Sequence, residues 1–334
     1  MDGSSGMTLC QDTSARTDAK RRGGHRLDEA TGRRLMFATL LGSLPRPPLP
    51  EDVPAEALVS AAVDAQVAAG LEPVTDGGWW GTLPALQAWQ RTARLTERAV
   101  KQAVVGPYSD ARTGSLAPSK ERATAVLAAA RVANLNLRAL AQAGCALIEI
   151  HEPAVVTIGT DEAGWALFRE AQLILTDGIV GTHLSLAITG GSADPAGLLA
   201  ILAAPYASLA LDLIAGPDNW RLVRAIPGDR GVVCGAISPI AGSDDGPEML
   251  LWAAAYAASS HSRGPGRVGL ATASSLGALP WESAIAKLGR LGEAMRLAAL
   301  PSDELRGQLD PRSIDIRSAA LGHAEPRKDR PRGT

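Results

Sequence analysis

The sequence predicts an α/β fold, a single (β/α)8 TIM barrel with a tail at each end, and three observations support this class. Short apolar runs alternate with longer helical patterns from about Met36 to Leu300, without a Pro- or Gly-rich linker between them. The runs are apolar on both faces, as parallel strands buried beneath helices must be. Eight such units in about 265 residues match the usual barrel size of about 250 residues. An open, doubly wound sheet is the competing class, but it usually begins with a Gly-rich turn, whereas the first turn here is GSLPRPP.

Eight apolar segments, rich in Leu or β-branched residues, are the expected strands. In chain order they are FATLLGSL (37–44), EPVTDGG (72–78), KQAVVGPYS (101–109), ALIEIHEP (146–153), GTHLSLAI (181–188), SLALDLI (208–214), RGVVCGAIS (230–238) and VGLATASS (268–275).

Three of the intervening helices have clear boundary signals. They are expected at 53–70, 120–144 and 281–300. Pro54 lies near the start of the first and Gly70 at its end, which is the usual asymmetry of helix termini. Ser119 is expected to cap the second helix.

Composition restricts the class of protein further. The chain is 46% hydrophobic and 20% charged, which excludes a disordered or collagen-like chain, and its formal net charge of −2 gives no electrostatic reason to bind nucleic acid or an anionic membrane. Three scattered cysteines favour a reducing cytoplasm, and no apolar run is long enough to span a bilayer. Residues 1–35 and 301–334 lack periodicity and are expected to be flexible tails. We therefore expect a cytoplasmic protein with a small-molecule partner, and homodimer formation is left open.

Polar side chains are expected at the carboxyl ends of the strands, where the active site of such a barrel forms. They are Ser43, Arg46, Asp76, Tyr108, Ser109, Asp110, His151, Glu152, His183, Ser185, Asp212, Ser238, Ser274 and Ser275. A single Ser or Asp after a strand is more often a cap for the next helix. The adjacent pair His151 and Glu152 is harder to explain in this way, because buried ionisable groups cost several kcal/mol unless they are paired or line a wet cavity. We expect this pair to be functional.

The strand ends also carry short motifs in a fixed order. They are GSLPRP (42–47), VTDGG (74–78), VKQAVVGPYS (100–109), AGCALIEIHEPAV (143–155), GTHLSL (181–186), VGLATASSL (268–276) and AIAKLGRL (284–291). In this order they resemble the motifs of the vitamin-B12-independent methionine synthase superfamily, in particular its catalytic C-terminal barrel. The most specific single match is AGCALIEIHEPAV, which is similar to A-G-x-x-x-I-Q-I-D-E-P-A-L. The resemblance covers roughly residues 37 to 300 and implies a TIM barrel that transfers methyl groups.

The metal site of that superfamily is altered in this chain. There, zinc is held by the His and Cys of an H-x-C motif, a Glu on the next strand and the Cys of D-C-G-L. The resemblance places His183, Ser185, Asp212 and Ser274 at these positions. A serine hydroxyl is a poor zinc ligand. We therefore predict that no catalytic zinc is bound.

The anchors that the superfamily uses for homocysteine are altered too. The glutamate of its D-G-E motif corresponds to Gly78, and the aspartate of I-D-E-P corresponds to His151. Without these carboxylates, the site loses its charged hold on an α-ammonium group. Methionine synthesis is therefore not expected.

The folate side of the site is better retained. The resemblance implies that a pterin stacks on a tryptophan, and Trp79, Trp80 and Trp89 lie in the corresponding stretch, with Trp89 nearest by spacing. A flat aromatic face suits such stacking. The alternative, that the tryptophans simply cover the barrel mouth or a dimer contact, is equally consistent with the sequence.

The first hypothesis is a zinc-independent methyltransferase of specialised metabolism. It would use methyltetrahydrofolate as donor and an acceptor other than homocysteine. His151 is the expected base, since histidine ordinarily titrates near neutral pH. Glu152 would orient the ligand or donate a proton, and His183, Asp212 and Asp76 would orient the base or bind the acceptor. The other expected ligand-binding residues are Ser43, Arg46, Tyr108, Ser185 and Ser274.

Two alternatives remain open at this point. One is a metal-free lyase related to the uroporphyrinogen decarboxylase barrels, in which Asp76 and Arg46 would stabilise charge. The other is a non-catalytic barrel that binds a ligand or a partner protein.

Overall fold

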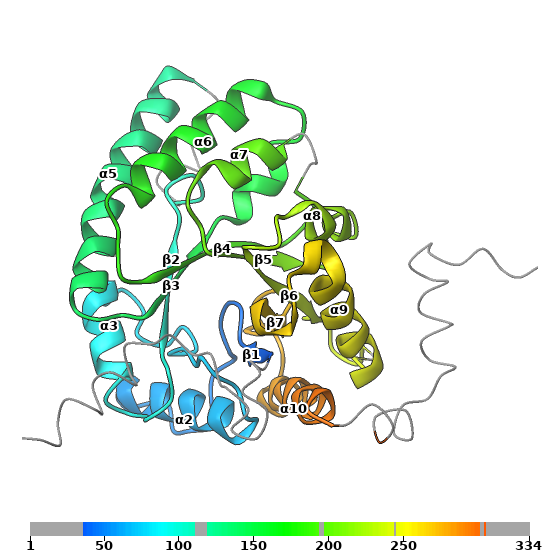
Figure 1. Cartoon of the computed structure of the whole chain (residues 1–334). Helices are drawn as coiled ribbons and strands as arrows, with labels where there is room; N and C mark the ends of the chain where they lie inside the picture. The colour runs from blue at the N-terminus through cyan, green and yellow to red at the C-terminus, as the bar shows by residue number, and fades with distance from the viewer. Residues whose placement is uncertain (1–35, 111–118, 194–196, 244, 301–303, 305–334) are drawn as a thin grey trace, which may run out of the picture.

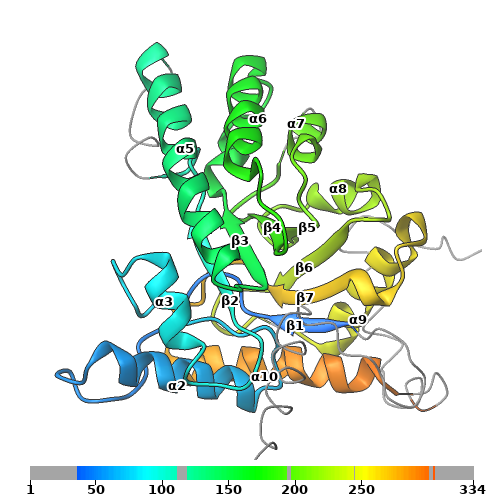
Figure 2. The same ribbon diagram turned by 60° about the vertical axis from the view of Figure 1, so that its left-hand side comes forward.

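A computed structural model describes residues 36–110, 119–193, 197–243, 245–300 and 304 of the 334-residue chain. The predicted tails, 1–35 and 301–334, therefore lie outside the described residues apart from residue 304. The described chain forms a curled parallel sheet with helices on its outer side, as Figures 1 and 2 show from two directions.

Seven strands pair in the order β1-β7-β6-β5-β4-β3-β2, and every pair is parallel. They are β1 (Phe37–Thr39), β2 (Lys101–Val105), β3 (Leu147–His151), β4 (His183–Ile188), β5 (Ser208–Asp212), β6 (Gly231–Ile237) and β7 (Val268–Thr272). Each lies within a segment expected to be a strand. The parallel α/β class is thus confirmed.

The segment expected as the second strand, 72–78, does not form a regular strand. It lies between the two edges of the sheet: Glu72 N donates a 2.9 Å hydrogen bond to a β1 carbonyl, and Val74 forms a single parallel bridge with Val100. Pro73 interrupts the pairing because it has no N–H to donate. The prediction of eight regular strands is therefore confirmed only for seven.

Eight α-helices follow the strands in the described part of the chain. They are α2 (Ala55–Ala68), α3 (Ala85–Thr92), α5 (Lys120–Gln142), α6 (Glu162–Thr176), α7 (Leu198–Ala203), α8 (Asn219–Ala225), α9 (Pro247–Ser259) and α10 (Trp281–Ala298). Short 3-10 helices occupy η1 (Pro153–Thr157), η3 (Ser260–Ser262) and η4 (Pro265–Arg267).

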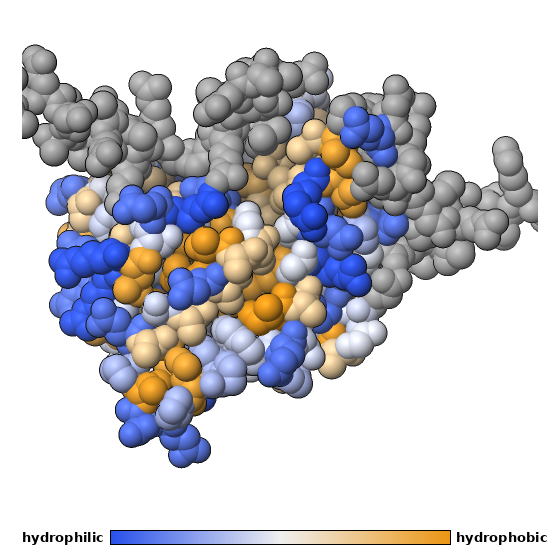
Figure 3. Space-filling model, turned by 90° about the horizontal axis from the view of Figure 1, so that it is seen from below, coloured by the Kyte–Doolittle hydropathy of each residue, from blue (hydrophilic) through white to orange (hydrophobic). Residues whose placement is uncertain are grey.

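Two of the expected helix boundary signals, Ser119 and Gly70, are confirmed. Ser119 Oγ accepts a 3.2 Å hydrogen bond from Arg122 N and so caps α5. Gly70, with φ +81°, ends the turn after α2. Among the described residues, none of the helices combines the length and apolar character that crossing a membrane requires. On the face covered by α2 and α10, hydrophobic patches alternate with hydrophilic side chains (Figure 3).

The inner side of the curled sheet has an apolar part and a polar part. Small side chains such as Ala187 and Ala210 pack with Leu41 into an apolar cluster inside the curl. Because residues paired across parallel strands point to the same face, Glu149 and Ser185 lie side by side within it. The carboxyl ends of β2 and β3 therefore open above a sheet interior that contains buried polar groups.

Candidate active site at the carboxyl ends of β2 and β3

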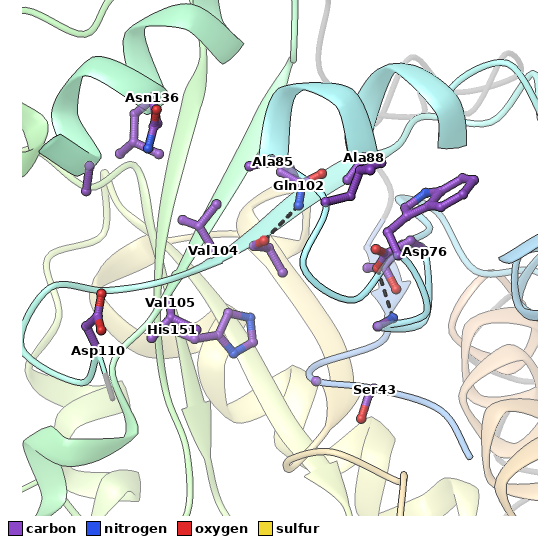
Figure 4. Close-up of a pocket in the computed structure, with 18 of the residues that line it drawn as sticks. Ser43, Asp76, Ala85, Ala88, Gln102, Val104, Val105, Asp110, Asn136 and His151 are labelled. Carbon is purple, nitrogen blue, oxygen red and sulfur yellow. Dashed lines mark hydrogen bonds between the residues drawn. The ribbon is translucent and has the colours of Figure 1, made fainter. Parts of the chain in front are cut away.

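A cavity of about 550 Å³ lies at the carboxyl ends of β2 and β3 and extends between α3 and α5 (Figure 4). The side chains that give it polar character are Ser43, Asp76, Gln102, Asp110, Asn136, His151 and Ser275. Its apolar lining includes Ala85, Ala88, Val104, Val105, Val132 and Ala133. The cavity thus combines a polar region at the strand ends with an apolar wall against the helices, as small-molecule sites commonly do.

His151 is the last residue of β3, and its ring points into the cavity toward the side where Ser43 and Asp76 lie (Figure 4). Its Nε2 lies 2.8 Å from Glu149 Oε1. Glu149 in turn receives both of its remaining contacts from Lys101, whose Nζ lies 2.9 Å from Oε1 and 2.8 Å from Oε2. We call Lys101, Glu149 and His151 the buried triad.

The charge on Glu149 is maintained by its two partners. Only 2% of Glu149 and 2% of Lys101 are exposed. Burial alone would raise the pKa of the Glu149 carboxyl, but the Lys101 charge and the His151 hydrogen bond hold the pKa at about 2. Glu149 is therefore a carboxylate that can only accept hydrogen bonds.

His151 and Glu152, the adjacent pair expected to be functional, do not share one site. Adjacent residues of a strand point to opposite faces, so Glu152 leaves the strand away from His151. Its Oε1 accepts hydrogen bonds from Tyr108 N (3.2 Å) and from Gln172 Nε2 (2.6 Å). Glu152 is completely buried and does not line the cavity. Burial outweighs these hydrogen bonds and raises its pKa to about 7.

Glu152 also determines which residue can follow β2. A Cβ on Gly106 would lie 2.2 Å from Glu152 Cδ, so only glycine fits there. Gln172 is fixed in turn by the hydroxyl of Tyr206, which donates to its Oε1. Glu152 therefore joins the loop after β2 to α6, and it supports the site from behind.

Asp76 and the two serines form the opposite wall of the cavity. Asp76 Oδ1 accepts a 2.9 Å hydrogen bond from Gly78 N. Burial raises the pKa of the Asp76 carboxyl above its ordinary value in spite of this hydrogen bond. Ser43 Oγ lies 2.6 Å from Ser275 Oγ, which connects the turn after β1 with the turn after β7.

Arg46 and Tyr108 are among the predicted ligand-binding residues that lie outside the cavity. Arg46 is exposed, and its Nη2 donates to the carbonyls of Pro50 (2.8 Å) and Glu51 (3.1 Å) within its own loop. Tyr108 is buried with its ring edge against Phe168, at 5.7 Å between centroids.

Of the three tryptophans, Trp80 lines the cavity. Its Nε1 donates a 2.8 Å hydrogen bond to Thr92 Oγ1. Trp89, which spacing favoured, packs instead against a hydrophobic cluster, and its Nε1 lies 3.3 Å from Val100 O. Trp79 is half-buried beside the same cluster. The loop after the irregular second strand, rather than α3, supplies the aromatic wall.

The positions that correspond to the zinc ligands do not converge. His183 is the first residue of β4, so its expected place at a carboxyl end is wrong; its Nε2 lies 2.8 Å from Ser208 Oγ at the opposite end of the sheet. There it lines a second cavity of about 220 Å³. Ser185 is buried within β4, and Ser274 is half-buried after β7 without lining the active-site cavity.

Asp212 does lie at a carboxyl end, but its oxygens are occupied. They accept three backbone N–H hydrogen bonds of 2.8–2.9 Å from the loops after β4 and β5. Burial raises the thiol pKa of Cys145 and Cys234 to about 12, so neither offers a thiolate. Over the described residues, no three His, Cys, Asp or Glu side chains are grouped so that they could hold a metal ion.

Sequence reasoning missed Lys101, Glu149, Gln102 and Asn136 as parts of the site. Glu149 could have been found from the period of two in a strand, which places it on the same face as His151. Lys101 carried a second signal, since a lysine in an apolar strand needs a buried partner. Gln102 and Asn136 had no comparable signal.

Comparison with known proteins shows the fold. No family model and no curated protein matches the sequence. A B12-independent methionine synthase from Shewanella sp. W3-18-1, solved in complex with selenomethionine, superposes with a TM-score of 0.63 at 15% identity over 82% of this chain and 99% of that one. A putative vitamin-B12-independent methionine synthase from Listeria monocytogenes gives 0.60 at 13% identity over 79% and 98% of the two chains. A methyltransferase from Methanosarcina mazei gives 0.57 at 13% identity over 84% and 97%. These neighbours share the curled parallel α/β fold of this chain, so the TIM barrel implied by the motif resemblance is confirmed as a barrel-like fold and not as a complete eight-stranded barrel.

Proposed function

We propose that this protein is a zinc-independent methyltransferase that takes the methyl group of methyltetrahydrofolate and passes it to a small acceptor other than homocysteine, in specialised metabolism. The observation that carries the proposal is the imidazole of His151, which is held by a buried carboxylate and opens on the main cavity. The cavity lies at the carboxyl end of the sheet, where barrels of this kind place their chemistry. The solved structures with this fold are named as methionine synthases and a methyltransferase.

The residues present do not fit a catalytic zinc ion. Two of the four corresponding side chains are serines, and His183 lies at the other end of the sheet. Asp212 already accepts three backbone hydrogen bonds. No step is therefore assigned to a metal.

The cavity does fit a folate donor. Its volume of about 550 Å³ suits a ligand with a flat bicyclic head, and Trp80 offers an aromatic wall. Asp76, Gln102 and Asn136 carry the hydrogen-bonding groups that a pterin edge needs. When bound, such a donor supplies a methyl carbon attached to a tertiary nitrogen.

The side chains of the cavity can carry out both proton transfers that methyl transfer needs. His151 accepts the proton of the acceptor's nucleophilic O–H, N–H or S–H group as that atom forms its bond to the methyl carbon. The bond between methyl and nitrogen breaks with its electron pair on the nitrogen, and Asp76, on the opposite wall of the cavity, passes a proton to that nitrogen. The net result moves one methyl group to the acceptor and one proton to the donor. Solvent exchange then returns the proton from His151 to Asp76.

Homocysteine is disfavoured as acceptor because the cavity has no carboxylates at the two positions that would hold its ammonium group. Gly78 and His151 occupy them. The lyase alternative is weakened by Arg46, since its guanidinium is bound to loop carbonyls outside the cavity. Within the part of the chain that the structure describes, Asp76 therefore lacks the arginine partner that this alternative requires.

Binding and metal analysis test the proposal together. Calorimetry with 5-methyltetrahydrofolate should show one site, and Trp80→Phe should weaken it while the matched variant Trp89→Phe does not. Elemental analysis should find no stoichiometric zinc in the wild type. Stoichiometric zinc that disappears in His183→Ala, or homocysteine methylation that depends on added zinc, would contradict the proposal.

A further inference from the structure

The buried triad fixes the direction of each of its hydrogen bonds. Lys101 Nζ can only donate, and it contacts both oxygens of Glu149 at 2.8–2.9 Å. Glu149, being ionised, can only accept. The 2.8 Å contact between Glu149 Oε1 and His151 Nε2 therefore requires the proton to be on Nε2.

The other ring nitrogen remains available for chemistry. Among the described residues, Glu149 provides the one hydrogen bond found at the His151 ring. With the proton on Nε2, a neutral imidazole has its lone pair on Nδ1. The ring lines the cavity, and 16% of its side chain is exposed there, whereas Glu149 is 2% exposed (Figure 4).

We propose that Lys101 and Glu149 are positioning residues that hold His151 in the Nε2–H tautomer and present Nδ1 to the cavity as the proton acceptor. Lys101 keeps Glu149 charged and directed at the ring, and Glu149 keeps the ring in one orientation. The catalytic part of this inference rests on the proposed function. The tautomer itself does not.

The acceptor class follows from this geometry. A lone pair without a negative charge activates a neutral nucleophile that loses one proton on alkylation, such as a hydroxyl, thiol or amine. The apolar wall formed by Ala88, Val104 and Val132 favours an acceptor with an apolar portion. A small zwitterion would leave that wall without a partner.

Nitrogen-15 NMR of protein labelled at histidine tests the tautomer. The pH is set by titration so that the His151 ring is neutral, and His151→Asn identifies its signals among the five histidines. In the wild type, Nε2 should carry a proton protected from solvent exchange, and Nδ1 should give the resonance of an unprotonated nitrogen. A proton on Nδ1 in the wild type would overturn the proposal without any variant.

Two double variants separate positioning from simple packing. In Lys101→Glu/Glu149→Lys, the ion pair is retained but a donor faces the ring, so the proton should move to Nδ1. In Lys101→Met/Glu149→Met, the protected Nε2 proton should be lost. Lys287→Met, which removes a different buried cation paired with Asp245, is the matched control and should leave the His151 signals unchanged. Unchanged His151 signals in both double variants would refute the positioning role.

A kinetic measurement distinguishes this inference from the proposed function. The charge-swapped variant Lys101→Glu/Glu149→Lys should bind 5-methyltetrahydrofolate with unchanged Kd but transfer its methyl group on the order of 10⁴-fold more slowly, as when a catalytic histidine elsewhere is forced into the wrong tautomer. If the NMR signals behave as expected but neither protein binds or uses the donor, the proposed function fails and the triad stands. An equal kcat in the wild type and the charge-swapped variant would show that the buried triad does not contribute to catalysis.

Discussion

Replacement of Lys101 by methionine tests how much the fold depends on the buried triad. The substitution keeps the length of the side chain but leaves Glu149 buried without its cation. Lys101 and His151 together outweigh burial and lower the Glu149 pKa from an ordinary value of 4.5 to about 2, which corresponds to about 3 kcal/mol. Breaking a buried ion pair by removal of one partner typically costs about 3–5 kcal/mol. We therefore expect Lys101→Met to lower the free energy of unfolding by about 3 kcal/mol or more at pH 7.

The pH dependence has a definite sign. In the wild type, the pKa of Glu149 is lower in the folded than in the unfolded protein. The stabilisation that the Glu149 carboxylate contributes is therefore present above about pH 4.5 and is lost as the pH falls toward about 2. In Lys101→Met, burial without the cation raises the pKa of Glu149 instead. Its protonation relieves the penalty, and the variant should approach the wild type as the pH falls from 7 to 5.

Thermal unfolding followed by circular dichroism measures both effects. A loss of about 3 kcal/mol lowers the Tm of a domain of this size by roughly 10 °C. Lys101→Met/Glu149→Gln should recover most of it, because no buried charge remains unpaired. Arg290→Ala, which breaks an exposed pair with Glu293, should change stability by less than about 1 kcal/mol. An unchanged Tm in Lys101→Met at pH 7, or an equal deficit in the double variant, would refute the reasoning.

Three other predictions follow from the site. Gly106→Ala should destabilise the protein by several kcal/mol because its Cβ would collide with Glu152. Adding Glu152→Ser to the same chain should recover much of the lost stability in thermal melts. If the effects of the two substitutions on stability simply add, the collision is not the cause. Glu152→Gln should be more stable than the wild type by up to about 3 kcal/mol at pH 8 and no more stable at pH 5. The reason is that the wild-type carboxyl, with its pKa of about 7, must ionise in a buried site as the pH rises. A stability gain that does not depend on pH in denaturant titrations would exclude this cause. His151→Asn should slow methyl transfer by about 10²–10⁴-fold at unchanged donor affinity. His183→Ala, at the other end of the sheet, should change neither the rate of methyl transfer nor the donor affinity. Equal losses in the two variants would show that the site is not in the cavity around His151.

Local rules predicted much of the fold. Helix caps such as Ser119 and Gly70 depend on a few neighbouring residues, and both are where the sequence placed them. Strand boundaries were less accurate because hydrogen bonds to neighbouring strands decide them, and these join residues far apart in the sequence. His183 shows the consequence. It lies near the start of the apolar segment 181–188, and β4 begins at this residue, so His183 is at the amino end of the strand.

The candidate site was predicted in part for the same reason. Asp76, Ser43 and His151 line one cavity because they follow different strands at the same edge of the sheet. Which tryptophan reaches the cavity depends on the path of the loop after Gly78, and no periodic pattern specifies such a path. Trp80 rather than Trp89 therefore emerged only from the structure.

The two inward residues of β3, Glu149 and His151, stabilise each other. In the motif that this strand resembles, I-Q-I-D-E-P, an amide precedes the aspartate by two positions; here Glu149 and His151 occupy the same two positions. Each change alone is unfavourable: a buried glutamate without a histidine or a lysine near it loses part of its stabilisation, and a histidine without the glutamate has no fixed tautomer. Together with Lys101 they form a fully hydrogen-bonded group at 2.8–2.9 Å. Glu149 and His151 therefore depend on each other, and under the proposed function the carboxylate is the orienting residue and the imidazole is the base.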